Sequence, residues 1–232
     1  ELSISGGVAT VASTPTGISK TAQNIWVLDV NISGTANGSE TLSVVPAAGN
    51  VIFDAAGNAA STSQSNNTAS LTEKILPTVT NVTSTTSDGS YKQGETIAIT
   101  VAFSEVVNVT GTPQLTLETG GSDAVVDYSS GTGSNTLTFN YTIGSGETSS
   151  DLDYKATSSL ALNGGTIKDA ALNNATLTLA SPGATNSLGD NKALIVDTTV
   201  PTVTNVTSTT SDGSYKQGET IAITVAFSEV VN

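Results

Sequence analysis

Residues 77–108 read PTVTNVTSTTSDGSYKQGETIAITVAFSEVVN, and residues 201–232 repeat this stretch without a single change. The two copies are 124 residues apart (201 minus 77). Self-similarity at a long fixed period is typical of a tandem array in which each repeat is one folding unit, and this period suits one small domain. The repeat therefore predicts a row of domains, and we expect the chain to be a slice of a longer array.

The repeated stretch also contains a clear strand signal. In residues 97–103, Ile, Val and Phe alternate with Ala and Thr, and residues 137–143 and 26–32 show the same period of two. Such alternation predicts strands with one face in a core and one in water. Trp26 is on the apolar side of its strand, so we expect it to pack in a core. No sustained 3.6-residue period occurs, so no helix is predicted.

The composition favours an all-β protein. Hydrophobic residues make up 37% of the chain and aromatic residues only 4%. The apolar set is mainly Val, Ile, Leu and Ala among many Thr and Ser residues, as suits pleated, half-buried surfaces. Short strand signals between Gly, Asn, Asp and Ser clusters are typical of a β-sandwich.

Charge and missing residue types exclude several functions. The net charge of −13 leaves no basic patch, so nucleic acid is not an expected partner. The chain has no His and no Cys, which excludes imidazole bases, thiol nucleophiles and the usual zinc ligand sets. No apolar run reaches transmembrane length, so no membrane insertion is expected in this segment.

The repeat divides the chain into three parts. Residues 77–200 form one complete repeat, and residues 201–232 are the opening strands of the next one. Residues 1–76 are interpreted as the later part of a related domain, because they share a turn with the complete repeat: DAAGN at 54–58 and DAALN at 169–173.

Two short linkers join these parts, EKILP at 73–77 and DTTVP at 197–201. Short linkers that contain Pro hold neighbouring domains in a defined orientation. The two end parts allow two interpretations. Either the array continues covalently at both ends, or residues 201–232 of one chain complete residues 1–76 of another, head to tail. The sequence does not separate them.

Several motifs resemble the bacterial immunoglobulin-like repeats of giant surface adhesins. They are SDGSYKQGE at 87–95, FSE at 103–105, GET at 146–148 with DLDY at 151–154, LNGGTIKD at 162–169 and the linker at 197–201. The resemblance implies tandem immunoglobulin-like β-sandwich domains that act as extracellular spacers on a bacterial cell surface, often stiffened by Ca²⁺ near domain junctions. Leu172 departs from the family turn, which usually has Gly, and Glu73 replaces the linker Asp.

Enzyme chemistry is not expected. Asp151 and Asp153 are the closest approach to a glycosidase carboxylate pair, but no aromatic-rich cleft accompanies them. A glycan-binding module is a second alternative to the spacer, and it requires an exposed aromatic platform.

Calcium is the strongest chemical hypothesis, because Ca²⁺ is held by loop carboxylates and carbonyls and the acidic residues here concentrate in loops and linkers. Each of them also has a simpler interpretation, as a turn-forming Asx residue or a solvated strand-end charge. We therefore expect a calcium-stiffened spacer of an adhesin or surface filament, with neighbouring repeats or other copies as partners. The candidate ligands are Asp54, Glu73, Asp88, Glu95, Glu105, Asp169, Asp197, Asp212, Glu219 and Glu229.

Overall fold

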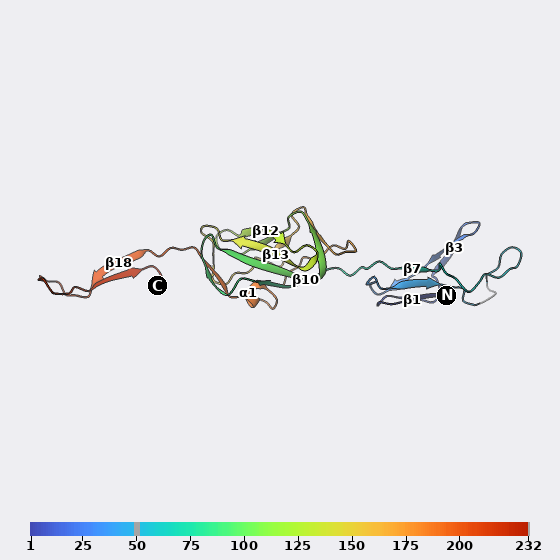
Figure 1. The fold of residues 1–232 in the computed structure, drawn as a ribbon, viewed down its shortest axis with the longest axis horizontal. Helices are drawn as coiled ribbons and strands as arrows, with labels where there is room; N and C mark the ends of the chain where they lie inside the picture. Colours follow the sequence, from blue (N-terminus) through green and yellow to red (C-terminus); the bar gives the residue numbers. More distant parts are fainter. Residues whose placement is uncertain (49–51, 232) are drawn as a thin grey trace.

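The computed structural model describes residues 1–48 and 52–231, and in these residues the chain is almost entirely β. The predicted all-β class is confirmed. Figure 1 shows three parts in a row: an N-terminal part, a central part with most of the strands, and a C-terminal hairpin. One short helix, α1 (Leu188–Asn191), was not predicted. It is a single turn whose Ser187 cap accepts a hydrogen bond from the Asp190 amide, too short to show a helical period.

The central part is built on one large sheet. Its strand order is β15-β11-β12-β13-β10-β16, and β8 pairs with β10. A smaller sheet has the order β14-β17-β9. The strands are β8 (Val79–Ser84), β9 (Gly89–Tyr91), β10 (Thr96–Thr110), β11 (Gln114–Leu117), β12 (Ala124–Ser130), β13 (Ser134–Thr142), β14 (Thr148–Ser149), β15 (Leu160–Ala161), β16 (Thr166–Lys168) and β17 (Leu194–Asp197).

Strand β10 organises the core of this part. Its register against β13 shifts between Ala102 and Val107, and beyond this irregularity it pairs with β16. The apolar side chains of residues 97–103 and 137–143 are buried, as the alternation predicted. Together with apolar residues from the other strands they form one continuous cluster, and all of its members lie between Val82 and Val196.

The N-terminal part has only small sheets, β1-β6-β7, β2-β5 and β3-β4. Most of its apolar side chains are exposed, and Trp26 is 59% exposed. The prediction that Trp26 packs in a core is wrong: β4 pairs with β3 in a two-stranded sheet, and the buried apolar cluster found in the described residues contains no residue of the N-terminal part. The strands are β1 (Leu2–Ser5), β2 (Thr10–Val11), β3 (Gly17–Ala22), β4 (Ile25–Asp29), β5 (Ile32–Ser33), β6 (Thr41–Val44) and β7 (Thr68–Ser70).

The C-terminal part is a hairpin of β18 (Val203–Ser208) and β19 (Ile223–Phe227). It lies apart from the central part in Figure 1, and all residues of both strands are exposed. Within the described residues, no helix combines the length and the apolarity needed to cross a membrane.

Candidate metal centre

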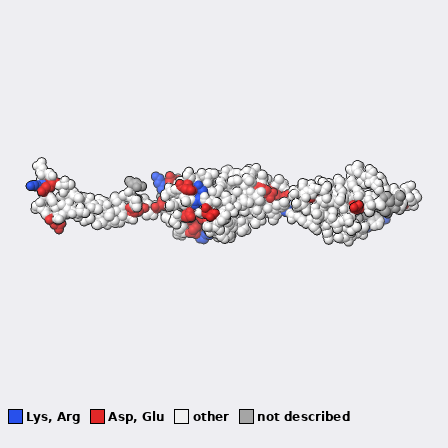
Figure 2. Space-filling model, turned by 90° about the horizontal axis from the view of Figure 1, so that it is seen from below, with Lys and Arg blue, Asp and Glu red and all other residues white. Residues whose placement is uncertain are grey.

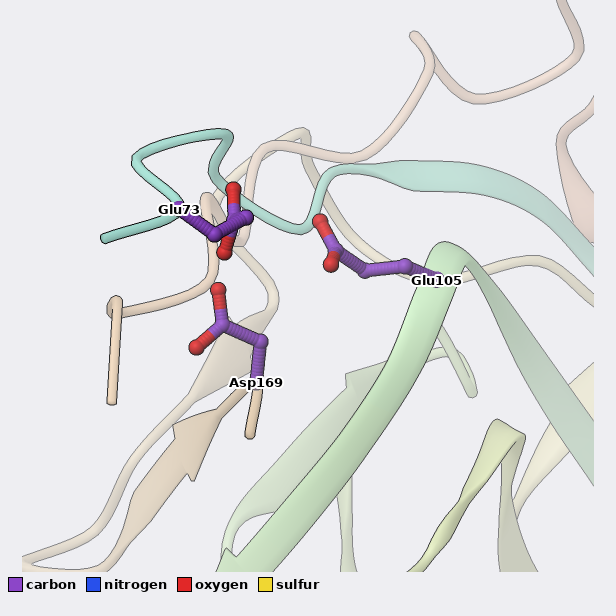
Figure 3. A group of neighbouring side chains, drawn as sticks. All are labelled: Glu73, Glu105 and Asp169. Atoms are coloured by element: carbon purple, nitrogen blue, oxygen red, sulfur yellow. The ribbon is translucent and has the colours of Figure 1, made fainter. Parts of the chain in front are cut away.

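Three carboxylates meet where the first linker joins the central part. One oxygen each of Glu73, Glu105 and Asp169 lies within 4.8 Å of the others. Figure 3 shows the three side chains pointing toward one another, from the linker, from the bend of β10 and from the segment after β16. On the face shown in Figure 2, acidic side chains gather toward both ends of the central part, where it meets its neighbours.

The backbone explains how Glu105 and Asp169 reach this point. Glu105 lies inside the register shift of β10, between the end of its pairing with β8 at Phe103 and the start of its pairing with β16 at Asn108. Asp169 opens the turn at 169–173, in which its own amide donates to the Asn173 carbonyl at 3.1 Å. Leu172 takes the left-handed position of this turn with a φ of 69°, where Gly57 of the related turn at 54–58 has 86°. Leu172 is therefore a strained substitute for glycine.

Asn173 connects the linker to the turn. Its Nδ2 donates to Asp169 Oδ2 at 2.7 Å and to Glu73 Oε2 at 2.9 Å, and the carbonyl oxygens of Glu73 and Ile75 lie 3.2 and 3.3 Å away. One amide group thus holds a linker carboxylate beside a domain carboxylate. Asn173 was not among the predicted site residues, although Asp-x-x-x-Asn recurs in both turns and indicates it.

The charges at the centre are not balanced by any cation of the described residues. Asp169 is buried, which by itself raises its pKa, but the hydrogen bonds from Asn173 outweigh burial and hold the pKa below its usual 3.8. Burial, and then the charges of Glu73 and Asp169, raise the pKa of Glu105 above its usual 4.5. Glu105 Oε1 is also buried without a hydrogen-bond partner in the described residues. An unpaired buried oxygen is costly, so this position favours a cation.

The donor set fits Ca²⁺. This ion binds six to eight oxygens at 2.3–2.6 Å, so oxygens on opposite sides of one ion are about 5 Å apart. Three carboxylates within 4.8 Å of one another satisfy that span. The Glu73 and Ile75 carbonyl oxygens accept hydrogen bonds from Asn173 Nδ2. When bound, Ca²⁺ would supply positive charge between the linker and the domain.

The other predicted ligands are spread along the chain, and none joins this cluster. Asp54 accepts hydrogen bonds from Asn58 and the Ala56 amide in its turn, and its pKa is lowered by Asn58. Asp88 pairs with Lys192, whose hydrogen bond lowers its pKa. Glu95 accepts from the Lys92 amide, and Asp197 from the Thr199 amide.

The three candidates of the repeated copy lie in the C-terminal part. Asp212 is exposed, and Glu219 accepts from the Lys216 amide, as Glu95 accepts from Lys92. Glu229 is the counterpart of Glu105, and its Oε1 is likewise buried without a partner in the part of the chain that the structure describes. Asp197 and Glu229 therefore repeat two of the three carboxylates of the first junction.

Asp151 and Asp153 lie near each other beside Gly189 of α1. Asp153 accepts from the amides of Tyr154 and Gly183 and is buried, and burial followed by the charge of Asp153 raises the pKa of Asp151. A Cβ added at Gly189 would lie 3.0 Å from Asp153 Oδ2, so the helix backbone closely covers this carboxylate. Asp153 is thus a buried carboxylate within the fold, whereas Asp151 is exposed.

The chain matches no protein-family model, no curated protein and no solved structure in comparisons with these three groups.

Proposed function

We propose that this chain is a structural spacer of tandem immunoglobulin-like β-sandwich domains, in an extracellular adhesin or surface filament of a bacterium, and that Ca²⁺ stiffens its domain junctions. The observation that carries the proposal is the carboxylate cluster at the first junction. Glu73 belongs to the linker, whereas Glu105 and Asp169 belong to the central part. An ion bound there would hold the linker to the domain.

The arrangement of the parts supports a mechanical role. The three parts lie in a row along the long axis of the molecule (Figure 1), and an identical sequence opens the central and the C-terminal part. In such a row, the number of modules sets the length and the junctions set the stiffness. Without the ion, three carboxylates at one junction repel one another and loosen the linker. With it, Glu73 is fixed against Glu105 and Asp169.

Calcium titration tests the proposal. We expect isothermal titration to detect Ca²⁺ binding to the chain, and small-angle scattering to show a smaller spread of shapes with Ca²⁺ than with chelator. We expect Glu105→Gln to abolish binding at the first junction, because it removes a charged ligand. The matched control is Glu118→Gln, since Glu118 is half exposed and lies outside the cluster.

Two outcomes would contradict the proposal. Titration without heat or change in scattering would remove the calcium junction while leaving the β-rich array. Equal binding by Glu105→Gln and Glu118→Gln would place the ion elsewhere. Melting with and without Ca²⁺ gives an independent reading, because an ion that binds only the folded state raises the melting temperature.

A further inference from the structure

The first and the last segment of the central part run side by side. The opening segment (residues 78–91) contains β8 and β9, and the closing segment (residues 186–197) contains α1 and β17. Strand β9 pairs with β17 in parallel, with Ser90 opposite Ile195 at the centre of the pairing. The line of contacts between the two segments is called the seam below. Where β9 and β17 meet, both strands run in the same direction.

The seam extends along β8 through hydrogen bonds to the closing segment. The Val82 amide donates to the Asn186 carbonyl at 2.9 Å. Asn191 Nδ2 donates to the Val82 carbonyl at 2.8 Å and to Asn81 Oδ1 at 2.7 Å. Backbone and side-chain groups of the closing segment thus hold one edge of β8, and the other edge of β8 pairs with β10.

Two further contacts join these bonds to the paired strands. The Gly89 amide donates to the Ala193 carbonyl at 3.0 Å, directly before the pairing of β9 with β17. Lys192 Nζ lies 2.7 Å from Asp88 Oδ1. The seam therefore reaches from β8 to the end of β9.

The inner side of the seam is shielded from water. Val82, Leu188 and Leu194 are fully buried, and Val196 is nearly so. All four belong to the apolar cluster of the central part. Hydrogen bonds at the edge of such a cluster are electrostatically stronger than hydrogen bonds in water, so the seam is a firm connection between the two segments.

Tension on the two linkers acts along the seam. The chain enters the central part at one end and leaves it at the other (Figure 1), with β8 after the first linker and β17 before the second. A pull on both linkers draws the opening segment one way and the closing segment the other. Because β9 and β17 are parallel, this pull slides one strand along the other and loads all their bonds at once. Bonds loaded together must break together, whereas a pull on the same end of both strands opens them one at a time.

We propose that the seam is the element by which the central part resists stretching along the long axis of the molecule. The inference rests on the spacer role in the proposed function, since a spacer is pulled through its linkers. It does not depend on Ca²⁺, because Glu73, Glu105 and Asp169 all lie outside the two segments. The seam acts by slowing unfolding, and the unfolding rate governs forced unfolding.

Pulling single molecules in two geometries tests the proposal. The 232-residue chain has no native cysteine, so pairs of introduced cysteines fix where the handles attach. Leu76→Cys with Val200→Cys pulls the seam from opposite ends, and Lys92→Cys with Val200→Cys pulls β9 and β17 from the same end. All three side chains are exposed and lie outside the strands. Both measurements are made in chelator.

The first geometry is expected to require a several-fold higher unfolding force than the second. Its handles enclose 124 residues (200 minus 76), so complete unfolding releases roughly 450 Å of chain at about 3.6 Å per residue. That length identifies the event as unfolding of the central part. Equal forces in the two geometries, or a higher force in the second, would overturn the proposal. Such a result would leave calcium binding as titrated, and a failed calcium titration would leave the two forces as measured, so the two proposals fail separately.

Asn191→Ala locates the resistance in the seam. It removes the side-chain amide that holds Val82 and Asn81, and we expect a lower unfolding force in the first geometry and an unchanged force in the second. The control is Asn140→Ala, which removes the hydrogen bond from Asn140 Nδ2 to Ser129 Oγ at 3.0 Å, outside the seam. We expect the control to change neither force. An Asn191→Ala variant that weakens both geometries equally would show a general loss of stability, and the proposed role of the seam would be wrong.

Discussion

The same 32 residues occur twice in this molecule, and their strands differ in burial between the two copies. In the central part, Phe103 is 2% exposed and its strand belongs to a large sheet, whereas the identical Phe227 is 41% exposed in a lone hairpin. The hairpin register, including its irregularity, is the same in both copies. Local pairing is therefore a property of the stretch itself, while burial and the outer pairings come from the neighbouring strands.

The largest expected effect comes from truncating the two phenylalanines. Phe103→Ala removes a ring from the packed core and is expected to destabilise the central part by about 3–5 kcal/mol. Phe227→Ala changes an exposed side chain of the single chain, and the same unfolding transition should shift by no more than about 0.5 kcal/mol. Urea unfolding of each variant measures both losses. Equal losses would show that the two copies are equally buried in solution.

The strands of the central part were accessible to sequence reasoning because their signal is local. The alternation in residues 97–103 indicates which face of the strand is apolar. A core forms where that face packs against the apolar face of another element. The same reasoning failed at Trp26, since alternation tells which side of a strand is apolar but not whether another strand is present to cover it. The one-turn helix α1 was not predicted because four residues are too few to show a 3.6-residue apolar period.

The candidate centre was predictable in part. The acidic residue that opens each linker pointed to Glu73, and the shared turn motif pointed to Asp169. The two lie close together only after folding. The grouping of these two with Glu105 depends on the register shift of β10 and on the amide of Asn173. Neither follows from residue types, because both are set by contacts between segments distant in the chain.

Asn173 and Asn58 occupy the same position in the two related turns, so replacing each by alanine compares the contributions of the two turns to stability. Asn173→Ala removes the amide that holds Glu73 beside Asp169, and hydrogen bonds to charged groups are worth about 1.5–3 kcal/mol. We expect a loss of that order in the free energy of unfolding of the central part. Asn58→Ala alters the turn of the N-terminal part and should leave the central transition in place. Urea melts followed by circular dichroism distinguish them, and a silent Asn173→Ala would contradict the proposed role of this amide.

The pH dependence of Glu105 gives a smaller effect with a definite sign. Its folded pKa is raised by burial and by two neighbouring acids, so the ionised carboxylate costs stability at neutral pH, and this cost disappears as the pH falls through the folded pKa toward 4.5. In chelator, Glu105→Gln should melt at a higher temperature than the wild type at pH 7 and at the same temperature below pH 4.5. Asp169, whose pKa is lowered, loses its contribution only below 3.8, outside that window.

Excess Ca²⁺ should invert the Glu105 result, since the ion requires ionised ligands. The wild type would then melt above Glu105→Gln at pH 7. The matched variant is Glu229→Gln, which changes the counterpart in the C-terminal hairpin and should leave the melting of the central part as it is at every pH. A wild type and a Glu105→Gln variant that track each other in chelator would show that Glu105 is solvated instead of clustered.

The smallest expected effect is a difference in melting temperature between variants of Asp88 and Asp212, which occupy the same position in the two copies of the repeat. Asp88 pairs with Lys192 at 2.7 Å, and the pair joins the opening hairpin segment to the segment before β17. Asp212, its identical counterpart, forms no ion pair among the described residues. Exposed ion pairs contribute little and are screened by salt. Asp88→Asn should therefore lower the melting temperature slightly at low salt and not at high salt, and Asp212→Asn should change it at neither. A loss in Asp88→Asn that is equal at low and high salt would show that the screened ion pair with Lys192 is not its cause.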